Sequence, residues 1–320
     1  MKSKNEIAKT SFPTGIGLGT MMMGWRINST DSEKIISMAY ENEISLIDTS
    51  VSYSRGYCHE IIGKALRNLK LRNRFFIATK VGGVSNDSDT PENRGYSKHN
   101  IIRQCELSLS QLKIECIDLL QLHNPTNDFR FEEVLEALNL LKIQGKIHNY
   151  GICNYSEIST EQLLIQIRKN NLSEPLTSQF EYNLLNFREK DSLFEFLKST
   201  NLKTLTWGPL SSGLLTDWYL DKSYLRPNSR LEFGRENSSK QIILNNASTQ
   251  YVLKKISNYC LRFNIPAQIF ALLWILKTKP DNCPLIGPSS IDQFIQLIEG
   301  VNNKKYHHID FNHPSLIGIS

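Results

Sequence analysis

Short apolar runs alternate with longer segments of helical periodicity along nearly the whole of this 320-residue chain. Near-continuous apolar strands separated by helices are typical of a parallel sheet that helices cover on the outside. The strand-like runs occupy residues 15–20, 45–50, 75–81, 116–123, 147–154, 176–182, 202–210 and 282–287. Eight such units predict an α/β fold, the closed (β/α)8 or TIM barrel, with residues 1–320 as a single domain and 301–320 as its C-terminal tail.

An open, doubly wound sheet of the Rossmann type is the main alternative for a chain that alternates strands and helices. The first strand-like run does contain Gly15, Gly17 and Gly19. Their spacing departs from the dinucleotide-binding fingerprint, because Thr20 stands where the third glycine is required. We therefore expect the barrel.

Three segments between the strands carry local predictions. The sequence STEQ, residues 159–162, predicts a helix with Ser159 or Thr160 as its N-cap residue. The long polar segments 82–97 and 217–240 both follow strands, so both are expected on the carboxyl-terminal rim of the barrel. Such loops are candidate lids over a substrate.

Composition argues against several classes of function. The net charge is +5, but the basic residues are dispersed among acidic ones, which gives no case for nucleic acid. The N-terminus has no apolar core, and no run approaches the ~18 apolar residues of a membrane span. The cysteines lack the spacing of a disulfide framework or a zinc site, so reduced thiols and a cytoplasmic location are expected. They are Cys58, Cys105, Cys116, Cys153, Cys260 and Cys283.

Polar side chains stand at the ends of three successive strand-like runs. These are Asp48, Lys80 and His123, and Tyr53 follows Asp48 by five positions. In a barrel, the carboxyl-terminal strand ends converge on one mouth, where active sites form. Each residue alone has an ordinary structural explanation, but their coincidence at consecutive strand ends predicts a catalytic group.

This set of side chains suits the delivery of a proton to a carbonyl oxygen. A tyrosine with a pKa of ~10 is a weak acid at neutral pH, and a lysine ammonium beside it lowers that pKa. A carboxylate keeps the lysine charged and in place, and a histidine hydrogen-bonds the carbonyl. The group contains an acid but no source of hydride, which predicts a nicotinamide cofactor and no metal.

The sequence resembles the aldo-keto reductase superfamily from about residue 15 to about residue 300. The family's pattern of an aspartate, four residues and a tyrosine, followed by a glycine and an acidic residue, is present, and further motifs follow in order. The matching segments are IDTSVSYSRGYCHEIIGKAL, IATKVGG, DLLQLHNP, GKIHNYGICNYS, SQFEYNLLN, TLTWGPLSSGLLT, PAQIFALLWIL and PLIGPSSIDQ. The resemblance implies that Asp48, Tyr53, Lys80 and His123 are the catalytic residues, with Tyr53 as general acid.

The resemblance also implies a set of cofactor-binding residues. Gly19 and Thr20 match the first strand beside the cofactor, Asn154 and Gln179 match the ligands of the nicotinamide carboxamide, and Trp207 matches an aromatic residue that stacks on the nicotinamide ring. The loop containing Leu210, Ser211, Gly213 and Leu214 matches the one whose backbone amides hold the pyrophosphate, and Gly287, Ser289, Ser290 and Gln293 match the segment that holds the adenosine phosphate.

Departures from the family pattern bear on the choice of cofactor. Gln293 stands where many members carry an arginine near the 2′-phosphate, which weakens the preference for NADPH over NADH. Lys304 and Lys305 are candidates to compensate. We expect NADPH, with NADH possible. Met21 stands where many members have tryptophan, which alters the wall of the pocket.

The leading hypothesis is therefore an NAD(P)H-dependent oxidoreductase that interconverts a small carbonyl compound and its alcohol. A regulatory subunit that binds the nucleotide with little turnover is the alternative, and a metal-dependent barrel isomerase lacks its cluster of acids and histidines. The charge and aromatic surface of the segment ENRGYSKH favour a polar, sugar-like substrate. The tail histidines His307, His308 and His313 lack the partners that a metal site needs.

Overall fold

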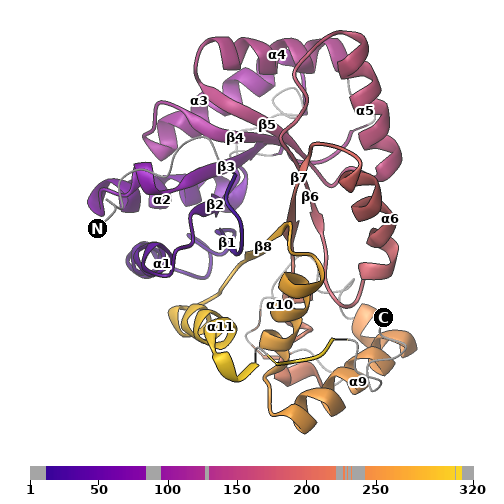
Figure 1. Ribbon diagram of the computed structural model, residues 1–320. Coiled ribbons are helices and arrows are strands. Elements are labelled where there is room, and N and C mark those ends of the chain that lie inside the picture. The colour runs from indigo at the N-terminus through magenta and orange to yellow at the C-terminus, as the bar shows by residue number, and fades with distance from the viewer. Residues whose placement is uncertain are drawn as a thin grey trace, which may run out of the picture.

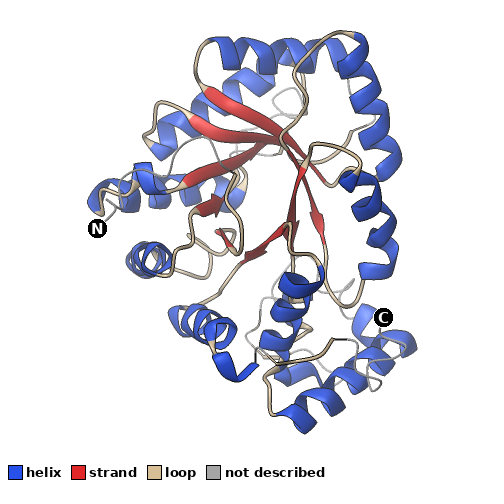
Figure 2. Cartoon of the chain, in the orientation of Figure 1, coloured by secondary structure: helices blue, strands red, loops and turns tan. Residues whose placement is uncertain are grey.

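The computed structural model describes residues 12–83, 95–126, 130–220, 226–227, 229, 232, 242–306 and 308–311. Within them, eight parallel strands close into a barrel, with helices around the outside (Figures 1 and 2). The strands are β1 (Gly17–Gly19), β2 (Leu46–Asp48), β3 (Phe76–Val81), β4 (Ile117–Leu122), β5 (Ile147–Cys153), β6 (Thr177–Glu181), β7 (Lys203–Trp207) and β8 (Asn282–Ile286). The predicted (β/α)8 barrel is confirmed.

Pairing between the first and last strands excludes the open sheet. β8 returns to β1 with Leu285 beside Gly17 and Ile286 beside Leu18. Every other strand pairs with its neighbours in chain order. The described strands therefore leave no free sheet edge. Because all eight strands are parallel, their carboxyl-terminal ends lie together at one mouth of the barrel.

Helices cover the barrel between consecutive strands, and a last helix follows β8. They are α1 (Ser29–Glu41), α2 (Tyr57–Asn68), α3 (Lys98–Leu112), α4 (Phe131–Ile143), α5 (Glu157–Lys169), α6 (Phe187–Lys198), α9 (Ala247–Phe263), α10 (Ala267–Thr278) and α11 (Ile291–Asn302). Among the described residues, no single helix is long and apolar enough to cross a membrane, although α9 and α10 together pass such a test as a pair bent by 98°.

The interior of the barrel is filled by strand side chains. Leu46, Ala78, Leu119, Leu205, Cys283 and Leu285 form one buried cluster drawn from five strands. Phe12 and Phe76 add an edge-to-face aromatic pair with ring centroids 5.6 Å apart. A packed interior of this kind leaves functional side chains only at the mouth.

Helix α5 begins earlier than the sequence predicts. Its N-cap residue is Ser156, which has an extended backbone and whose hydroxyl accepts a hydrogen bond from the Ser159 amide at 3.2 Å. The hydroxyl of Thr160 points back to the Ser156 carbonyl at 2.7 Å and is buried. The prediction of Ser159 or Thr160 as N-cap was wrong, because an equally good capping serine lies one turn upstream.

Several predicted features lie outside the described residues. These are most of both candidate lids, namely residues 84–94 and all but eight residues of 217–240, together with His307 and His313 of the tail.

A buried histidine ties α2 to the strand that carries Lys80. The His59 ring lies 3.0 Å from the Thr79 hydroxyl of β3 through Nε2, and 3.3 Å from the Gln111 side-chain oxygen of α3 through Nδ1. Burial lowers the pKa of His59 to about 3, and the positive charge of Lys80 adds to this effect, so the ring is neutral in the folded protein.

This neutral histidine makes stability depend on pH. In the unfolded chain His59 takes up a proton below its ordinary pKa of ~6.5, so its contribution to folding is lost as pH falls below that value. Between pH 7.5 and pH 5 we expect the loss to be ~2 kcal/mol for this residue. Urea unfolding at the two pH values should therefore show a smaller decrease for His59→Gln than for wild type. Equal decreases in the two proteins would contradict a buried, neutral His59.

Candidate active site

The alternation of side chains along the strands carries the candidate catalytic residues to the mouth. Leu46 and Ala78 point into the barrel, and the residues two positions later, Asp48 and Lys80, continue the same inward faces. Asp48 is paired in register with Ala78 across β2 and β3. His123 directly follows β4, and its amide donates to the Val81 carbonyl at 3.0 Å. The three predicted strand-end residues therefore converge.

Tyr53 is held by a short, strained turn between β2 and α2. The turn, η1 (Tyr53–Gly56), contains Ser54 and Arg55 with φ of 47° and 55°, and Gly56 with φ of 91°. Left-handed conformations are costly for residues other than glycine and persist where the surroundings enforce them. The φ of 91° favours glycine at position 56, and an added side chain would also meet the Gln111 side-chain nitrogen at 2.3 Å. The turn thereby fixes the direction of the Tyr53 phenol.

A buried ion pair lies beneath the phenol. The Lys80 ammonium donates to Asp48 Oδ1 and, at 2.9 Å, to the Thr49 carbonyl, and both charged side chains are almost fully buried. The ammonium also lies 3.3 Å from the Tyr53 hydroxyl. Burial alone would lower the pKa of Lys80, but the attraction of Asp48 outweighs it and raises the pKa above its ordinary value. Lys80 is therefore positively charged beside the phenol.

The Tyr53 hydroxyl is protonated in this arrangement. Burial raises its pKa to about 12, although Lys80 alone would lower it. The sequence analysis expected Lys80 to lower the pKa of Tyr53, and Lys80 does act in that direction. The pKa is nevertheless raised, because the effect of burial is larger. The phenol is thus a donor that gives up its proton only to a strong base.

His123 completes the group as a neutral side chain. Burial, together with the smaller effect of the positive charge on Lys80, lowers its pKa to about 3. Its ring lies edge-on to Tyr53 with centroids 6.2 Å apart. The Ser50 hydroxyl lies 3.5 Å from Nδ1. A neutral imidazole can donate one hydrogen bond to a carbonyl oxygen without adding charge to the pocket.

Gln121 is a member of the site that the sequence reasoning missed. It is fully buried in β4, and its side-chain amide donates to Asp48 Oδ2 at 3.2 Å. The amide of Gln179 donates to the same oxygen at 2.8 Å and to the Gln121 oxygen at 3.1 Å. Two amides and one ammonium thus bind the carboxylate, which leaves it fully partnered away from water.

Removal of this amide should weaken the site and the fold together. In Gln121→Leu, Asp48 loses one donor and Gln179 loses its acceptor, so we expect the free energy of unfolding to fall by ~1–3 kcal/mol. We expect kcat to fall up to about tenfold, because less than ~1.4 kcal/mol of that loss reaches the reacting groups. Urea unfolding and steady-state kinetics test this. Wild-type values for both quantities would contradict a positioning role for Gln121.

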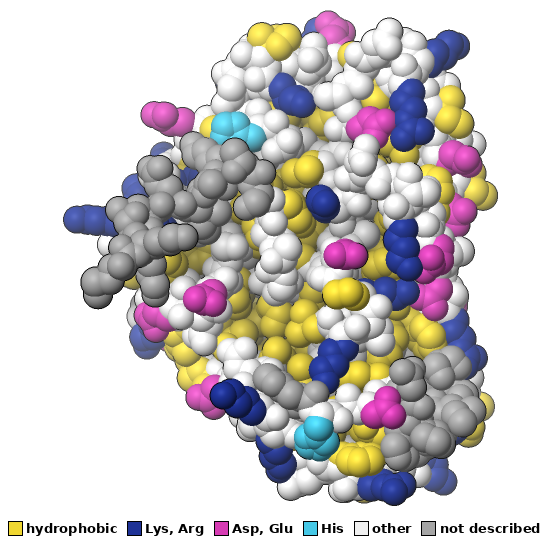
Figure 3. Space-filling model, viewed as in Figure 1, with side chains coloured by type: hydrophobic (Ala, Val, Ile, Leu, Met, Phe, Trp, Pro, Cys, Tyr) yellow, Lys and Arg dark blue, Asp and Glu magenta, His cyan; other side chains and the backbone are white. Residues whose placement is uncertain are grey.

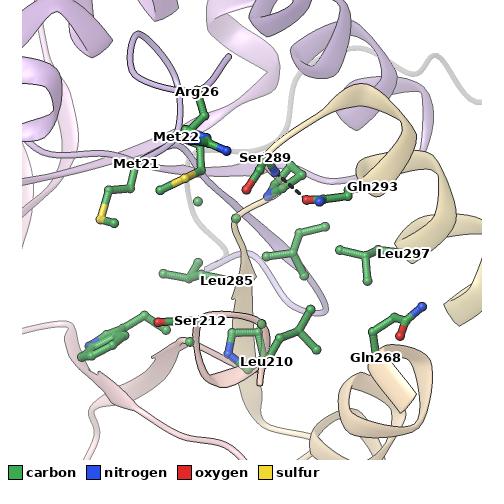
Figure 4. A pocket seen from close by; sticks show the side chains of 18 of the residues that line it. Met21, Met22, Arg26, Leu210, Ser212, Gln268, Leu285, Ser289, Gln293 and Leu297 are labelled. Atoms are coloured by element: carbon green, nitrogen blue, oxygen red, sulfur yellow. Dashed lines mark hydrogen bonds between the residues drawn. The ribbon is translucent and has the colours of Figure 1, made fainter. Parts of the chain in front are cut away.

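A pocket of about 780 Å³ runs from this group across the mouth of the barrel. Figure 4 shows side chains from the β1 loop and from the segments after β7 and β8 pointing into it. Hydrophobic side chains also gather in the centre of the face seen in Figure 3. The predicted residues that line the pocket are Gly19, Thr20, Asp48, Tyr53, Lys80, His123, Asn154, Gln179, Trp207, Leu210, Gly213, Gly287, Ser289 and Gln293.

Asn154 and Trp207 form one wall near the catalytic group. The indole nitrogen of Trp207 donates to the Asn154 side-chain oxygen at 2.9 Å. The amide nitrogen of Asn154 donates to the His123 carbonyl at 3.0 Å and to the Asn124 side chain at 2.8 Å. Both side chains are thereby locked in orientation, with the Trp207 ring on the wall of the pocket.

The other predicted contacts, Ser211, Leu214 and Ser290, do not line the pocket. Leu214 is fully buried in the core, and the Ser290 hydroxyl caps α11 by accepting from the Gln293 amide at 3.2 Å. The amides of Ser211 and Leu214 donate to carbonyls of their own loop. Of this loop, Leu210, Ser212 and Gly213 line the pocket, and Ser212 was not among the predicted residues.

A closed parallel barrel with an acid–base group at its mouth defines a barrel enzyme with a site for a long ligand. Comparison with known families makes this specific. The model of the Aldo/keto reductase family matches residues 15–312, so the chain belongs to this family. The protein is accordingly an oxidoreductase of the kind that uses a nicotinamide cofactor on carbonyl compounds and alcohols.

Proposed function

We propose that the protein reduces an aldehyde or ketone with NADPH, NADH being the possible substitute, and that Tyr53 is the general acid. The same residues serve the oxidation of the corresponding alcohol. The observation that carries the proposal is the Tyr53 hydroxyl 3.3 Å from a buried, charged Lys80 at one end of the long pocket. The proposal treats residues 1–320 as one domain. It also places the protein in the reducing cytoplasm, because all six cysteines are free thiols.

The residues of the pocket fit a nicotinamide dinucleotide. A flat aromatic wall, Trp207, lies at the catalytic end, and hydroxyl and amide groups of Ser289 and Gln293 lie at the other. Between them, a side chain added at Gly213 would meet no atom, so the β7 loop leaves open room beside the pocket. The hydroxyl and amide groups in the pocket can form hydrogen bonds with the sugar and phosphate groups of such a ligand.

When bound, the reduced nicotinamide supplies hydride to the carbonyl carbon. The Tyr53 hydroxyl donates its proton to the carbonyl oxygen as negative charge develops there, and the Lys80 ammonium stabilises the phenolate that remains. Asp48 keeps Lys80 charged and oriented. The neutral His123 ring orients the carbonyl oxygen toward Tyr53 through a hydrogen bond.

The side chain of Gln179 has a defined role in this arrangement. Its nitrogen donates to Asp48 and Gln121, and its oxygen, which accepts from the Cys153 thiol at 3.6 Å, keeps a second lone pair for another hydrogen bond. An acceptor there suits the amide nitrogen of a carboxamide. Asn154 acts through Trp207 and His123, which it holds in place.

The proposal is tested by following nicotinamide absorbance with NADPH and NADH against a panel of aldehydes, ketones and aldose sugars. We expect turnover with at least one class of carbonyl compound and saturation by cofactor. Binding of the nucleotide without turnover across the whole panel would instead favour the regulatory alternative. Turnover that required an added metal ion would contradict the mechanism.

A further inference from the structure

The aromatic residue of the segment ENRGYSKH is buried, although the sequence analysis expected it to be surface for a polar substrate. This residue, Tyr96, directly precedes Ser97, the N-cap residue of α3, and is only 6% exposed. It is not among the residues that line the pocket. The prediction of aromatic surface in this segment was wrong, because the ring packs inside the protein.

The Tyr96 ring packs against the backbone just beyond β3. Gly82 has a φ of 102°, and a side chain added to it would meet the Tyr96 ring at 2.3 Å. The buried Gln104 side chain of α3 accepts from the Gly82 amide at 2.7 Å and donates to the Gly83 carbonyl at 2.9 Å. The Gly95 amide donates to the Gly82 carbonyl at 3.3 Å. These hydrogen bonds hold Tyr96 in a fixed place beside the carboxyl-terminal end of β3.

The Tyr96 hydroxyl accepts a hydrogen bond from the Asn124 amide at 2.8 Å. Asn124 directly follows His123, so this amide belongs to the peptide group that joins the two residues. The carbonyl of the same peptide group, that of His123, accepts from the Asn154 side-chain nitrogen at 3.0 Å. Because the N–H and C=O of a trans peptide point in opposite directions, Tyr96 and Asn154 hold this peptide plane from both sides.

The backbone on the amino side of His123 is fixed as well. The His123 amide donates to the Val81 carbonyl of β3 at 3.0 Å. Hydrogen bonds on both sides of a residue restrict its two backbone dihedrals, and these determine where its side chain can point. The ring itself has a weaker contact, since the Ser50 hydroxyl lies 3.5 Å from Nδ1, which is long for a hydrogen bond. The direction of the imidazole therefore depends largely on the backbone.

A phenylalanine could replace the ring of Tyr96 but not its hydroxyl. Burial raises the pKa of the Tyr96 phenol above its ordinary value, so the hydroxyl is neutral. A phenylalanine at this position would keep the packing against Gly82 and remove only the acceptor of the Asn124 amide. The peptide group after His123 would then be held from the Asn154 side alone.

We propose that Tyr96 is a positioning residue for His123. Its hydroxyl fixes the peptide group that follows His123 and thereby holds the imidazole in the direction that orients the substrate carbonyl toward Tyr53. The inference rests on the proposed function, since His123 has that role there. Because Tyr96 does not line the pocket, its effect on the reaction passes through His123.

A double-mutant cycle with Tyr96→Phe, His123→Gln and the two substitutions together tests this assignment. The glutamine amide leaves a weaker donor, so the rate remains measurable. For the best substrate of the carbonyl panel, we expect Tyr96→Phe to lower kcat by about 2–10-fold, the net value of one hydrogen bond, and to leave the Kd for NADPH within about twofold. In the His123→Gln background, the same substitution should have no further effect on kcat.

The matched control is Tyr259→Phe. Tyr259 is also buried, and its hydroxyl donates to the Asp310 carbonyl at 3.0 Å, away from the residues that line the pocket. We expect this substitution to lower stability slightly and to leave kcat unchanged.

The orientation of the ring is also measured without turnover. In protein labelled with ¹⁵N-histidine, the imidazole nitrogen signals of His123 are assigned by their loss in His123→Gln. We expect these signals to shift or broaden in Tyr96→Phe and to stay in place in Tyr259→Phe.

Three results would overturn the assignment. They are unchanged His123 ring signals in Tyr96→Phe, an unchanged kcat for that variant, and a fall in kcat of the same size with and without the His123 ring. Failure of the proposed function is distinguishable from these results, because wild type would then turn over no carbonyl compound. The ring signals would still show whether Tyr96 holds His123 in place.

Discussion

Replacing Tyr53 with phenylalanine should lower kcat for carbonyl reduction by about 10²–10⁴-fold while leaving the affinity for NADPH nearly unchanged. The substitution removes only the hydroxyl oxygen that lies 3.3 Å from Lys80 and that donates the proton. The ring remains to support His123 and the strained turn. Steady-state kinetics and direct titration of NADPH separate the two quantities.

A matched control distinguishes chemistry from the general loss of a buried phenol. The hydroxyl of Tyr150 donates to the Ser173 carbonyl, away from the pocket, and its ring is buried in β5. Tyr150→Phe should lower stability slightly and leave kcat unchanged. If Tyr53→Phe and Tyr150→Phe had the same kcat as wild type, Tyr53 would not be the acid.

Replacing Lys80 with methionine should damage the fold as well as the reaction. The substitution leaves the Asp48 carboxylate buried without its counter-ion, which costs about 3–5 kcal/mol in comparable pairs. Reduction should also fall severely, because the phenolate left by Tyr53 loses the charge that stabilises it. Urea unfolding and kinetics at saturating NADPH measure the two effects.

A double variant separates these two consequences. In Asp48→Asn/Lys80→Met the buried charges are removed together, so most of the lost stability should return, whereas reduction should stay low. The double variant thus separates the effect of Lys80 on stability from its effect on the reaction. Recovery of kcat in the double variant would show that Lys80 acts only as the partner of Asp48, and would contradict its proposed role beside Tyr53.

The barrel and the convergence of Asp48, Lys80 and His123 could be predicted because both depend on local periodicity. Strand-like runs at regular intervals determine the barrel, and a closed barrel brings consecutive strand ends to one mouth. Tyr53 could be assigned from its position just past a strand end, without knowledge of the left-handed residues that orient it.

Gln121 could not be assigned in the same way. Gln121 lies within the apolar run DLLQLH, and the signal that would have found it is its spacing of two from Leu119 and from His123, which places all three on the inward face.

The pKa of Tyr53 could not be predicted from the sequence either. The effect of Lys80 follows from proximity, but the larger effect of burial depends on side chains from distant parts of the chain that exclude water from the mouth. The consequence is a phenol that is fully protonated throughout the physiological range, as a general acid for reduction must be.

The central claim is that a hydride goes to a carbonyl carbon while Tyr53 protonates its oxygen. The most direct test is a single turnover of an aromatic aldehyde with NADPH deuterated at the transferable position of C4, with the product examined by mass spectrometry. The account predicts one deuterium on the carbinol carbon with wild type and almost no product with Tyr53→Phe. Alcohol without deuterium, or labelled alcohol formed equally fast by Tyr53→Phe, would contradict it.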